Sequence, residues 1–261
     1  MPPAFHSDAR ERLILALDLP SAAQAHALLA ALGPSAAPRW VKVGLQLFLA
    51  EGPPVVHALR EQGLSVFLDL KLHDIPNTVT SAIRALAGLQ VEMLTVHAAG
   101  GPEMLAAAAE AAASLRRPPR LLAVTVLTSM DAAQLASSGI DRTPQQQVLQ
   151  LAHLARSCGI HGLVASPLEA ALLRSQADGH ALHIVTPGIR PALSAQDDQQ
   201  RVATPGAALV AGADQLVVGR PITRAADPAA AFRALLAEIE TAVEAQGRQQ
   251  KEPVSRTPEL T

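Results

Sequence analysis

Residues 65–78 read SVFLDLKLHDIPNT, an apolar run that passes into alternating charges and then into a proline. The first four residues are typical of a buried strand, whereas Asp and Lys are residue types that proteins bury only when they are paired. Residues two apart on a strand point to the same side, so Asp69 and Lys71 face one way and the leucines around them face the other. The stretch therefore predicts a buried strand that ends in a preorganised polar site.

Seven further apolar runs alternate with Ala/Leu-rich segments of helical length. Strands that alternate with amphipathic helices imply right-handed βαβ units and a parallel sheet, and eight units in about 250 residues is typical of a closed barrel. We predict an α/β fold, a single-domain (β/α)8 TIM barrel, with a doubly wound open sheet as the alternative. The eight runs are Leu13 to Asp18, Trp40 to Gly44, Ser65 to Lys71, Glu92 to His97, Leu121 to Leu127, His161 to Ser166, Leu182 to Thr186 and Gln215 to Gly219.

Capping residues and breakers delimit the helices between these runs. Ser21 can cap a helix through Leu32, and Pro76 can occupy the first turn of a helix over residues 77–86. The stretch 246–261 is polar, lacks periodicity and contains two prolines, which is typical of a disordered tail. The predicted organisation is an N-terminal extension over 1–12, the barrel over 13–245, and the tail. Further helices are expected at Pro102 to Leu115, Pro144 to Ser157, Pro167 to Ala177 and Pro228 to Ala245.

Composition limits the classes of function. The chain has 261 residues, 49% of them hydrophobic, a net charge of −2 and only 2% aromatic residues, so neither a nucleic-acid surface nor an anionic-membrane surface is indicated. The single cysteine, Cys158, excludes an intrachain disulfide and fits a reducing compartment. With no apolar signal region and no stretch of transmembrane length, we expect a cytoplasmic protein.

Polar residues follow nearly every predicted strand, where the loops of such a barrel form the active-site face. Taken singly, Asp18 and Thr128 have structural explanations as turn or capping residues. Lys42 lies between two valines and needs a carboxylate partner, and a purely structural salt-bridge network with the charges of the third strand is the alternative to a functional site. Gly219 and Arg220 follow the last strand, where barrels commonly bind phosphate.

In this order the motifs resemble the orotidine 5′-phosphate decarboxylase family of the bacterial type. The resemblance spans residue 13 to about residue 240, and its Asp-x-Lys-x-x-Asp-Ile block is highly specific. The motifs are LALD at 15–18, VKVG at 41–44, FLDLKLHDIPNT at 67–78, VHAAGG at 96–101, LTS at 127–129, TPGIR at 186–190, RVATP at 201–205 and VVGR at 217–220.

The resemblance implies a (β/α)8 barrel that works as a homodimer without cofactor or metal. The family's Lys-Asp-Lys-Asp charge array maps onto Lys42, Asp69, Lys71 and Asp74. The last carboxylate and the hydroxyl of Thr78 would reach into the partner's site.

The implied reaction is the decarboxylation of orotidine 5′-monophosphate to UMP and CO2 in pyrimidine biosynthesis. Loss of CO2 from C6 leaves a carbanion that resonance barely delocalises, so electrostatics must stabilise it. Lys71 would stabilise this charge and then protonate C6 as a general acid. The substrate-binding residues implied by the family are Asp18, Lys42, Asp69, Thr78, Thr128, Arg190, Gln199, Gly219 and Arg220, with residues 188–200 as a closing loop.

Two other functions fit parts of the pattern. A related barrel with an Asp-x-Lys-x-x-Asp strand could be a Mg²⁺-dependent phosphosugar decarboxylase or hexulose-phosphate synthase, although no His-Glu-x-x-His type of metal motif occurs. A catalytically silent nucleotide-binding barrel would be expected to lose Lys71 or Asp69 while keeping Arg220, and this chain keeps all three.

Overall fold

The computed structural model describes residues 8–176, 179–191 and 202–249. Eight parallel strands pair in chain order, and the first strand pairs with the last, with Leu13 opposite Leu216, so the sheet is a closed barrel. This confirms the predicted TIM barrel and rules out the open sheet. The strands are β1 (Leu13–Ala16), β2 (Trp40–Gly44), β3 (Ser65–Leu72), β4 (Met93–His97), β5 (Arg120–Val124), β6 (Gly162–Val164), β7 (His183–Thr186) and β8 (Gln215–Val218).

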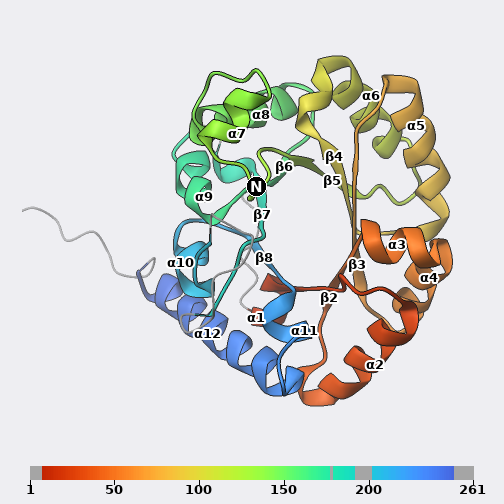
Figure 1. Ribbon diagram of the computed structural model, residues 1–261, viewed down its shortest axis with the longest axis vertical. Helices are drawn as coiled ribbons and strands as arrows, with labels where there is room; N and C mark the ends of the chain where they lie inside the picture. The colour runs from red at the N-terminus through yellow and green to blue at the C-terminus, as the bar shows by residue number, and fades with distance from the viewer. Residues whose placement is uncertain (1–7, 177–178, 192–201, 250–261) are drawn as a thin grey trace, which may run out of the picture.

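The helices surround the strands on the outside of the barrel (Figure 1). They are α1 (Ala9–Arg12), α2 (Ala22–Leu32), α3 (Leu45–Glu51), α4 (Pro53–Glu61), α5 (Pro76–Ala85), α6 (Gly101–Ala113), α7 (Ala132–Ser137), α8 (Pro144–Ser157), α9 (Pro167–Arg174), α10 (Pro205–Val210), α11 (Arg220–Thr223) and α12 (Pro228–Gln249). Single 3₁₀ turns are η1 (Pro34–Ala36), η2 (Leu86–Leu89), η3 (Ala98–Gly100) and η4 (Gly179–Ala181).

Local signals explain the best-predicted boundaries. The Ser21 side chain accepts a hydrogen bond from the backbone N–H of Gln24 and begins α2 as predicted. Helix α8 has the predicted bounds because Thr143 and Gln146 form a capping box before it. Strands β1, β5 and β6 end earlier than predicted, since the residues that follow them leave the ladder and run into the loops of the cavity face.

Two ends of the chain differ from the predicted organisation. Helix α12 continues to Gln249, so residues 246–249 belong to the last helix and not to the predicted tail. Helix α1 lies in the predicted N-terminal extension, yet Arg12 is buried and its guanidinium donates to the backbone carbonyl of Asp214 at 3.0 Å. Residues 9–12 are therefore packed onto the barrel, where they contact α12.

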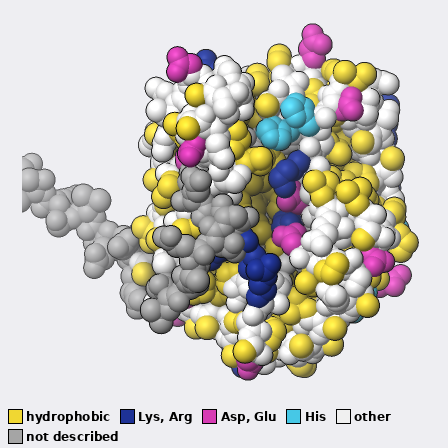
Figure 2. Space-filling view, viewed as in Figure 1, with side chains coloured by type: hydrophobic (Ala, Val, Ile, Leu, Met, Phe, Trp, Pro, Cys, Tyr) yellow, Lys and Arg dark blue, Asp and Glu magenta, His cyan; other side chains and the backbone are white. Residues whose placement is uncertain are grey.

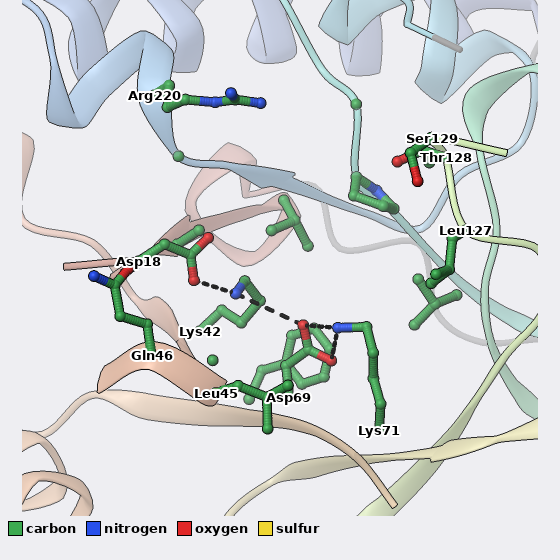
Figure 3. A pocket seen from close by; sticks show the side chains of 18 of the residues that line it. Asp18, Lys42, Leu45, Gln46, Asp69, Lys71, Leu127, Thr128, Ser129 and Arg220 are labelled. Atoms are coloured by element: carbon green, nitrogen blue, oxygen red, sulfur yellow. Dashed lines mark hydrogen bonds and ion pairs between the residues drawn. The ribbon is translucent and has the colours of Figure 1, made fainter. Parts of the chain in front are cut away.

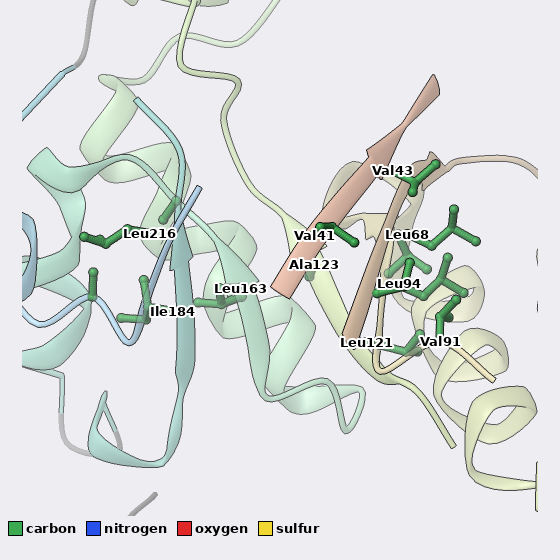
Figure 4. Close-up of a cluster of buried hydrophobic side chains, with 14 of the residues drawn as sticks. Val41, Val43, Leu68, Val91, Leu94, Leu121, Ala123, Leu163, Ile184 and Leu216 are labelled. Atoms are coloured by element: carbon green, nitrogen blue, oxygen red, sulfur yellow. The ribbon is translucent and has the colours of Figure 1, made fainter. Parts of the chain in front are cut away.

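Alternation along each strand divides the apolar side chains into two layers. Inward-facing residues such as Ile14, Phe67 and Leu122 fill the barrel. Their outward-facing neighbours pack between the sheet and the helices, as Val41, Leu94 and others do in Figure 4. This packing leaves the two ends of the barrel for polar groups.

A polar network closes the barrel at the amino-terminal ends of the strands. His183 Nε2 lies 3.0 Å from Gln215 Oε1, and its Nδ1 lies 3.8 Å from Asp214 Oδ2. Arg174 pairs with the same carboxylate at 2.5 Å. Burial first, and then the nearby Arg120 and Arg174, lower the pKa of His183 to about 4 against the opposing effect of Asp214 and Gln215.

This pKa predicts a pH dependence of stability. Between about pH 4 and pH 6.5 the unfolded chain binds a proton at His183 that the folded protein does not, so the free energy of unfolding falls as the pH falls through this window. Urea unfolding at pH 7 and pH 5 measures the slope. His183→Gln should flatten it, whereas the same change at the exposed His57 should not. An equal slope in wild type and His183→Gln would contradict the assignment.

Candidate active site

A cavity of about 790 Å³ opens at the carboxyl ends of the strands. Figure 2 shows it as a hollow on this face with basic and acidic side chains exposed inside it. Among the predicted site residues, those in its wall are Asp18, Lys42, Asp69, Lys71, Thr128, Arg190, Gly219 and Arg220. The structure thus brings eight predicted positions from most of the strand ends into one cavity.

Four charged side chains form a continuous chain of ion pairs on one side of the cavity (Figure 3). Lys42 Nζ donates to Asp18 Oδ1 at 2.6 Å and lies 3.6 Å from Asp69 Oδ2. Lys71 Nζ donates to both carboxylate oxygens of Asp69, at 2.8 and 2.7 Å. The charges therefore alternate from Asp18 to Lys71, and two of the chain's three lysines lie in this arrangement.

Neighbouring strands place these groups side by side. Strand β2 pairs with β3 so that Gly44 lies opposite Asp69, which brings Lys42 toward the same end of the barrel. A Cβ atom on Gly44 would lie 2.8 Å from Asp18 Oδ1 and 2.9 Å from Lys42 Nζ, so a side chain at this position would displace this ion pair. In the VKVG motif, Lys42 thus supplies the charge and Gly44 supplies the space for its ion pair with Asp18.

Strand β3 is irregular where it carries the second lysine. Lys71 has a φ of 50°, a left-handed conformation that costs about 1–2 kcal/mol for a residue with a Cβ atom. Its backbone N–H donates to Thr95 Oγ1 at 2.8 Å instead of continuing the ladder. Alternation predicted that Asp69 and Lys71 point to the same side, and their side chains do form an ion pair, but a bulge and not a regular strand gives their final geometry.

The carboxylate of Asp69 lies deep in the chain of ion pairs, with only 12% of its side chain exposed. Burial by itself would raise its pKa, but ion pairing with Lys42 and Lys71 and hydrogen bonds from Lys71 and Thr95 outweigh burial and hold the pKa below its usual value. Asp69 is therefore a stable anion between two ammonium groups. Its negative charge favours the two ammonium groups, those of Lys42 and Lys71, at the positions where they pair with it.

A second part of the wall, across the cavity from Lys71, carries cationic and glycine residues. Arg220 begins α11 directly after Gly219, and Figure 3 shows its side chain on the far side of the cavity from Lys71. Arg190 lies two residues after Gly188, which has a φ of 82°, a conformation that favours glycine. A guanidinium with backbone N–H groups nearby suits a phosphate or another anion.

Three predicted residues are not in this wall. Asp74 and Thr78 are exposed, and Asp74 Oδ1 accepts a hydrogen bond from the neighbouring Ile75 N–H at 2.7 Å. Within a single chain, therefore, neither residue joins the ion pairs of the cavity. Gln199 lies outside the described residues.

The cavity also contains residues that sequence reasoning missed. Arg224 and Thr223 line it beside Arg220, and Gln46 is also in the wall. Ser129 lines it too; the LTS motif contains this residue, but it was not among the predicted site residues. The spacing of four between the two arginines is a helical signal that could have identified Arg224. Gln46 had no comparable signal, because nothing in the sequence distinguishes it from an ordinary residue in the first turn of α3.

His97 packs at the end of β4. Its ring stacks on His73 with centroids 5.0 Å apart, and its Nδ1 accepts a hydrogen bond from Ala99 N–H at 3.3 Å. Burial, and then the neighbouring His73 and Lys71, lower its pKa. A neutral His97 at this place adds no competing positive charge next to Lys71.

Within the described part of the chain, no group of three or more His, Cys, Asp or Glu side chains is arranged to hold a metal ion. No helix within the same residues is both long and apolar enough to cross a membrane.

Fold and site together define a barrel enzyme whose active site lies at the carboxyl ends of the strands. The profile of the "Orotidine 5'-phosphate decarboxylase / HUMPS family" matches residues 11–235. The chain belongs to this family, which confirms the resemblance found in the sequence, and it is a carboxy-lyase.

Similar proteins cover nearly the whole chain. The orotidine 5′-phosphate decarboxylase of Halorhodospira halophila is 54% identical over 88% of this chain and 97% of its own, and that of Chromobacterium violaceum is 52% identical over 87% and 91%. The crystal structure of orotidine 5′-phosphate decarboxylase from Lactobacillus acidophilus superposes with a TM-score of 0.76 at 40% identity, covering 88% of this chain and 99% of that one.

The electrostatic account of Asp69 predicts the effect of removing one cation. Lys42→Met leaves the burial of Asp69 in place but removes an ion pair, so the pKa of Asp69 should rise. The carboxyl ¹³C resonance of Asp69, followed through a pH titration, measures it. Arg224→Met removes a cation from the same cavity without a contact to Asp69 and is the matched control. An unchanged pKa in Lys42→Met would contradict the account.

Proposed function

We propose that the protein converts orotidine 5′-monophosphate to UMP and CO2, the last step of UMP synthesis, without cofactor or metal. The observation that carries the proposal is the Lys71 ammonium held by both oxygens of Asp69 at 2.8 and 2.7 Å inside the cavity. Relatives with about half of their residues identical carry the name of this decarboxylase, which supports the same substrate here.

The chemistry requires a fixed positive charge at C6. When CO2 leaves, the electron pair of the broken bond stays on C6 in the plane of the ring, where resonance barely delocalises it. The Lys71 ammonium stabilises this pair and then donates a proton to it, which forms the C6–H bond of UMP. Asp69 positions the ammonium before the reaction, so little reorganisation is needed during it.

Asp69 has a second effect on the bound substrate. A substrate carboxylate bound next to the Lys71 ammonium would also be close to the Asp69 carboxylate, and like charges repel. This repulsion is relieved as neutral CO2 forms. In the bound substrate, the binding energy of groups remote from C6, such as the phosphate, offsets the repulsion.

The other wall residues divide the rest of the substrate among them. Asp18 and Lys42 hydrogen-bond the ribose hydroxyls, and Thr128 contacts the pyrimidine. The cationic wall binds the phosphate through Arg190, Gly219 and Arg220, and Gln199, outside the described residues, is proposed as a further phosphate contact. Binding energy from a phosphate far from C6 can then close the site and exclude water.

A homodimer completes this proposed site. Asp74 and Thr78 are exposed on one chain, together with Ile75, which is 66% exposed. An exposed apolar side chain between two polar site residues is suited to a subunit interface. Asp74 of one subunit then extends the charge array of the other, and Thr78 contacts its substrate.

Loss of the ammonium should abolish turnover but spare binding. Lys71→Ala removes both the charge stabilisation and the general acid, so CO2 release from orotidine 5′-monophosphate should fall at least about 10⁴-fold. The dissociation constant for UMP, measured by titration calorimetry, should stay within about tenfold because the phosphate contacts remain. Unchanged turnover in Lys71→Ala would end the proposal.

The same assay separates the two alternatives. A Mg²⁺-dependent barrel enzyme would lose activity in EDTA and regain it with Mg²⁺, whereas the proposed enzyme should be indifferent to both. A silent nucleotide-binding barrel would bind UMP and release no CO2 even as wild type.

Shared sites predict complementation between two inactive variants. In a Lys71→Ala/Asp74→Ala heterodimer, one site carries both substitutions and the other carries neither. After unfolding and refolding as an equal mixture, about a quarter of the wild-type activity should return. Each variant refolded alone is the control. A mixture no more active than the two variants alone would show that each chain builds its site by itself.

A further inference from the structure

A bulge in β3 faces one residue of β4. Leu68 pairs with Leu94 and Leu72 pairs with Val96, so the three residues between the two leucines of β3 lie opposite Thr95 alone. Asp69 and Lys71 are both within this bulge. Something other than the regular ladder must therefore hold the two charged residues in place.

The hydroxyl of Thr95 contacts both of them. Thr95 Oγ1 accepts the backbone N–H of Lys71 at 2.8 Å and donates to Asp69 Oδ1 at 3.0 Å. A hydroxyl can accept and donate at once, so one atom satisfies the amide and orients the carboxylate. Thr95 has no exposed surface and is absent from the cavity wall, so water does not compete for these bonds.

The contact to the backbone is made at the strained residue. Lys71 has a left-handed φ of 50°, and the hydrogen bond that its backbone N–H donates to Thr95 Oγ1 is the contact that holds this conformation from the neighbouring strand. The same side chain fixes the oxygen that receives the ammonium of Lys71 at 2.8 Å. The Thr95 hydroxyl thus positions the backbone amide of Lys71 directly and its ammonium through Asp69.

We infer that Thr95 is a positioning residue, whose hydroxyl locks the bulge of β3 so that the Lys71 ammonium stays against Asp69. The catalytic consequence rests on the proposed function, whereas the locking of the backbone does not. The charged groups facing Asp69 are Lys42 from β2 and Lys71 from β3 itself, and Thr95 is its contact from β4.

Substitutions at buried threonines of the barrel test this role. Thr95→Val removes the hydroxyl at nearly constant volume, and Thr95→Ser keeps it. Thr186→Val is the matched control, because Thr186 is equally buried on β7 and its hydroxyl has no hydrogen-bond partner within the described residues. Thr95→Ala replaces Thr95→Val if the valine variant does not fold.

Lysine labelling gives a readout that needs no activity. The chain has only Lys42, Lys71 and Lys251, so ¹⁵N-lysine protein gives three backbone amide signals, and Lys71→Ala assigns one of them. Without the Thr95 hydroxyl the Lys71 amide should exchange with solvent at least about tenfold faster, whereas Thr95→Ser and Thr186→Val should stay within about threefold of wild type.

Turnover gives the second readout. In Thr95→Val, kcat should fall at least about tenfold while the UMP dissociation constant stays within about twofold, and Thr95→Ser should restore kcat. Unchanged Lys71 exchange in Thr95→Val, or a Thr95→Ser variant as impaired as Thr95→Val, overturns the inference. If wild type itself releases no CO2, the proposed function fails and the amide exchange alone decides the role of Thr95.

Discussion

The ion pair between Asp69 and Lys71 is the constraint on which the rest of the site depends. A carboxylate that is buried to this extent is costly unless cations compensate it, and two ammonium groups do so from adjacent strands. The alternation of charge extends to Asp18 through Lys42, so each group has a neighbour of opposite sign. Lys71, whose side chain is 33% exposed and lines the cavity, ends this series of ion pairs.

The barrel supplies the rigidity that this arrangement requires. Closure of the sheet fixes the spacing of β1 to β3, at whose ends the charges lie, and of β4, which carries Thr95, while β7 and β8 end in the cationic wall on the other side. The reacting carbon and the phosphate of the proposed substrate would therefore be held by different strands of a single sheet. Such a division lets phosphate binding contribute to catalysis at a distance.

Sequence patterns could predict the parts of this design that residue type reveals. Eight apolar runs predicted the barrel, and charges at strand ends predicted the charged residues of the cavity wall apart from Arg224, because a buried Asp or Lys is unusual wherever it occurs. Thr95 could not be found in this way, since threonine is an ordinary strand residue and its role depends on a bulge and a positive φ. The position of Asp74 outside the cavity of its own chain is likewise a matter of three-dimensional placement, and its proposed role belongs to an assembly.

The central claim is that an ammonium at position 71 performs the chemistry, and aminoethylation tests it most directly. Lys71→Cys in a Cys158→Ala background has one cysteine, which bromoethylamine converts to a side chain that again ends in an ammonium. CO2 release from orotidine 5′-monophosphate is measured before and after this reaction. The account predicts that the cysteine protein is inactive and that turnover returns with the ammonium; a cysteine protein with wild-type turnover, or an aminoethylated protein that stays inactive, would contradict it.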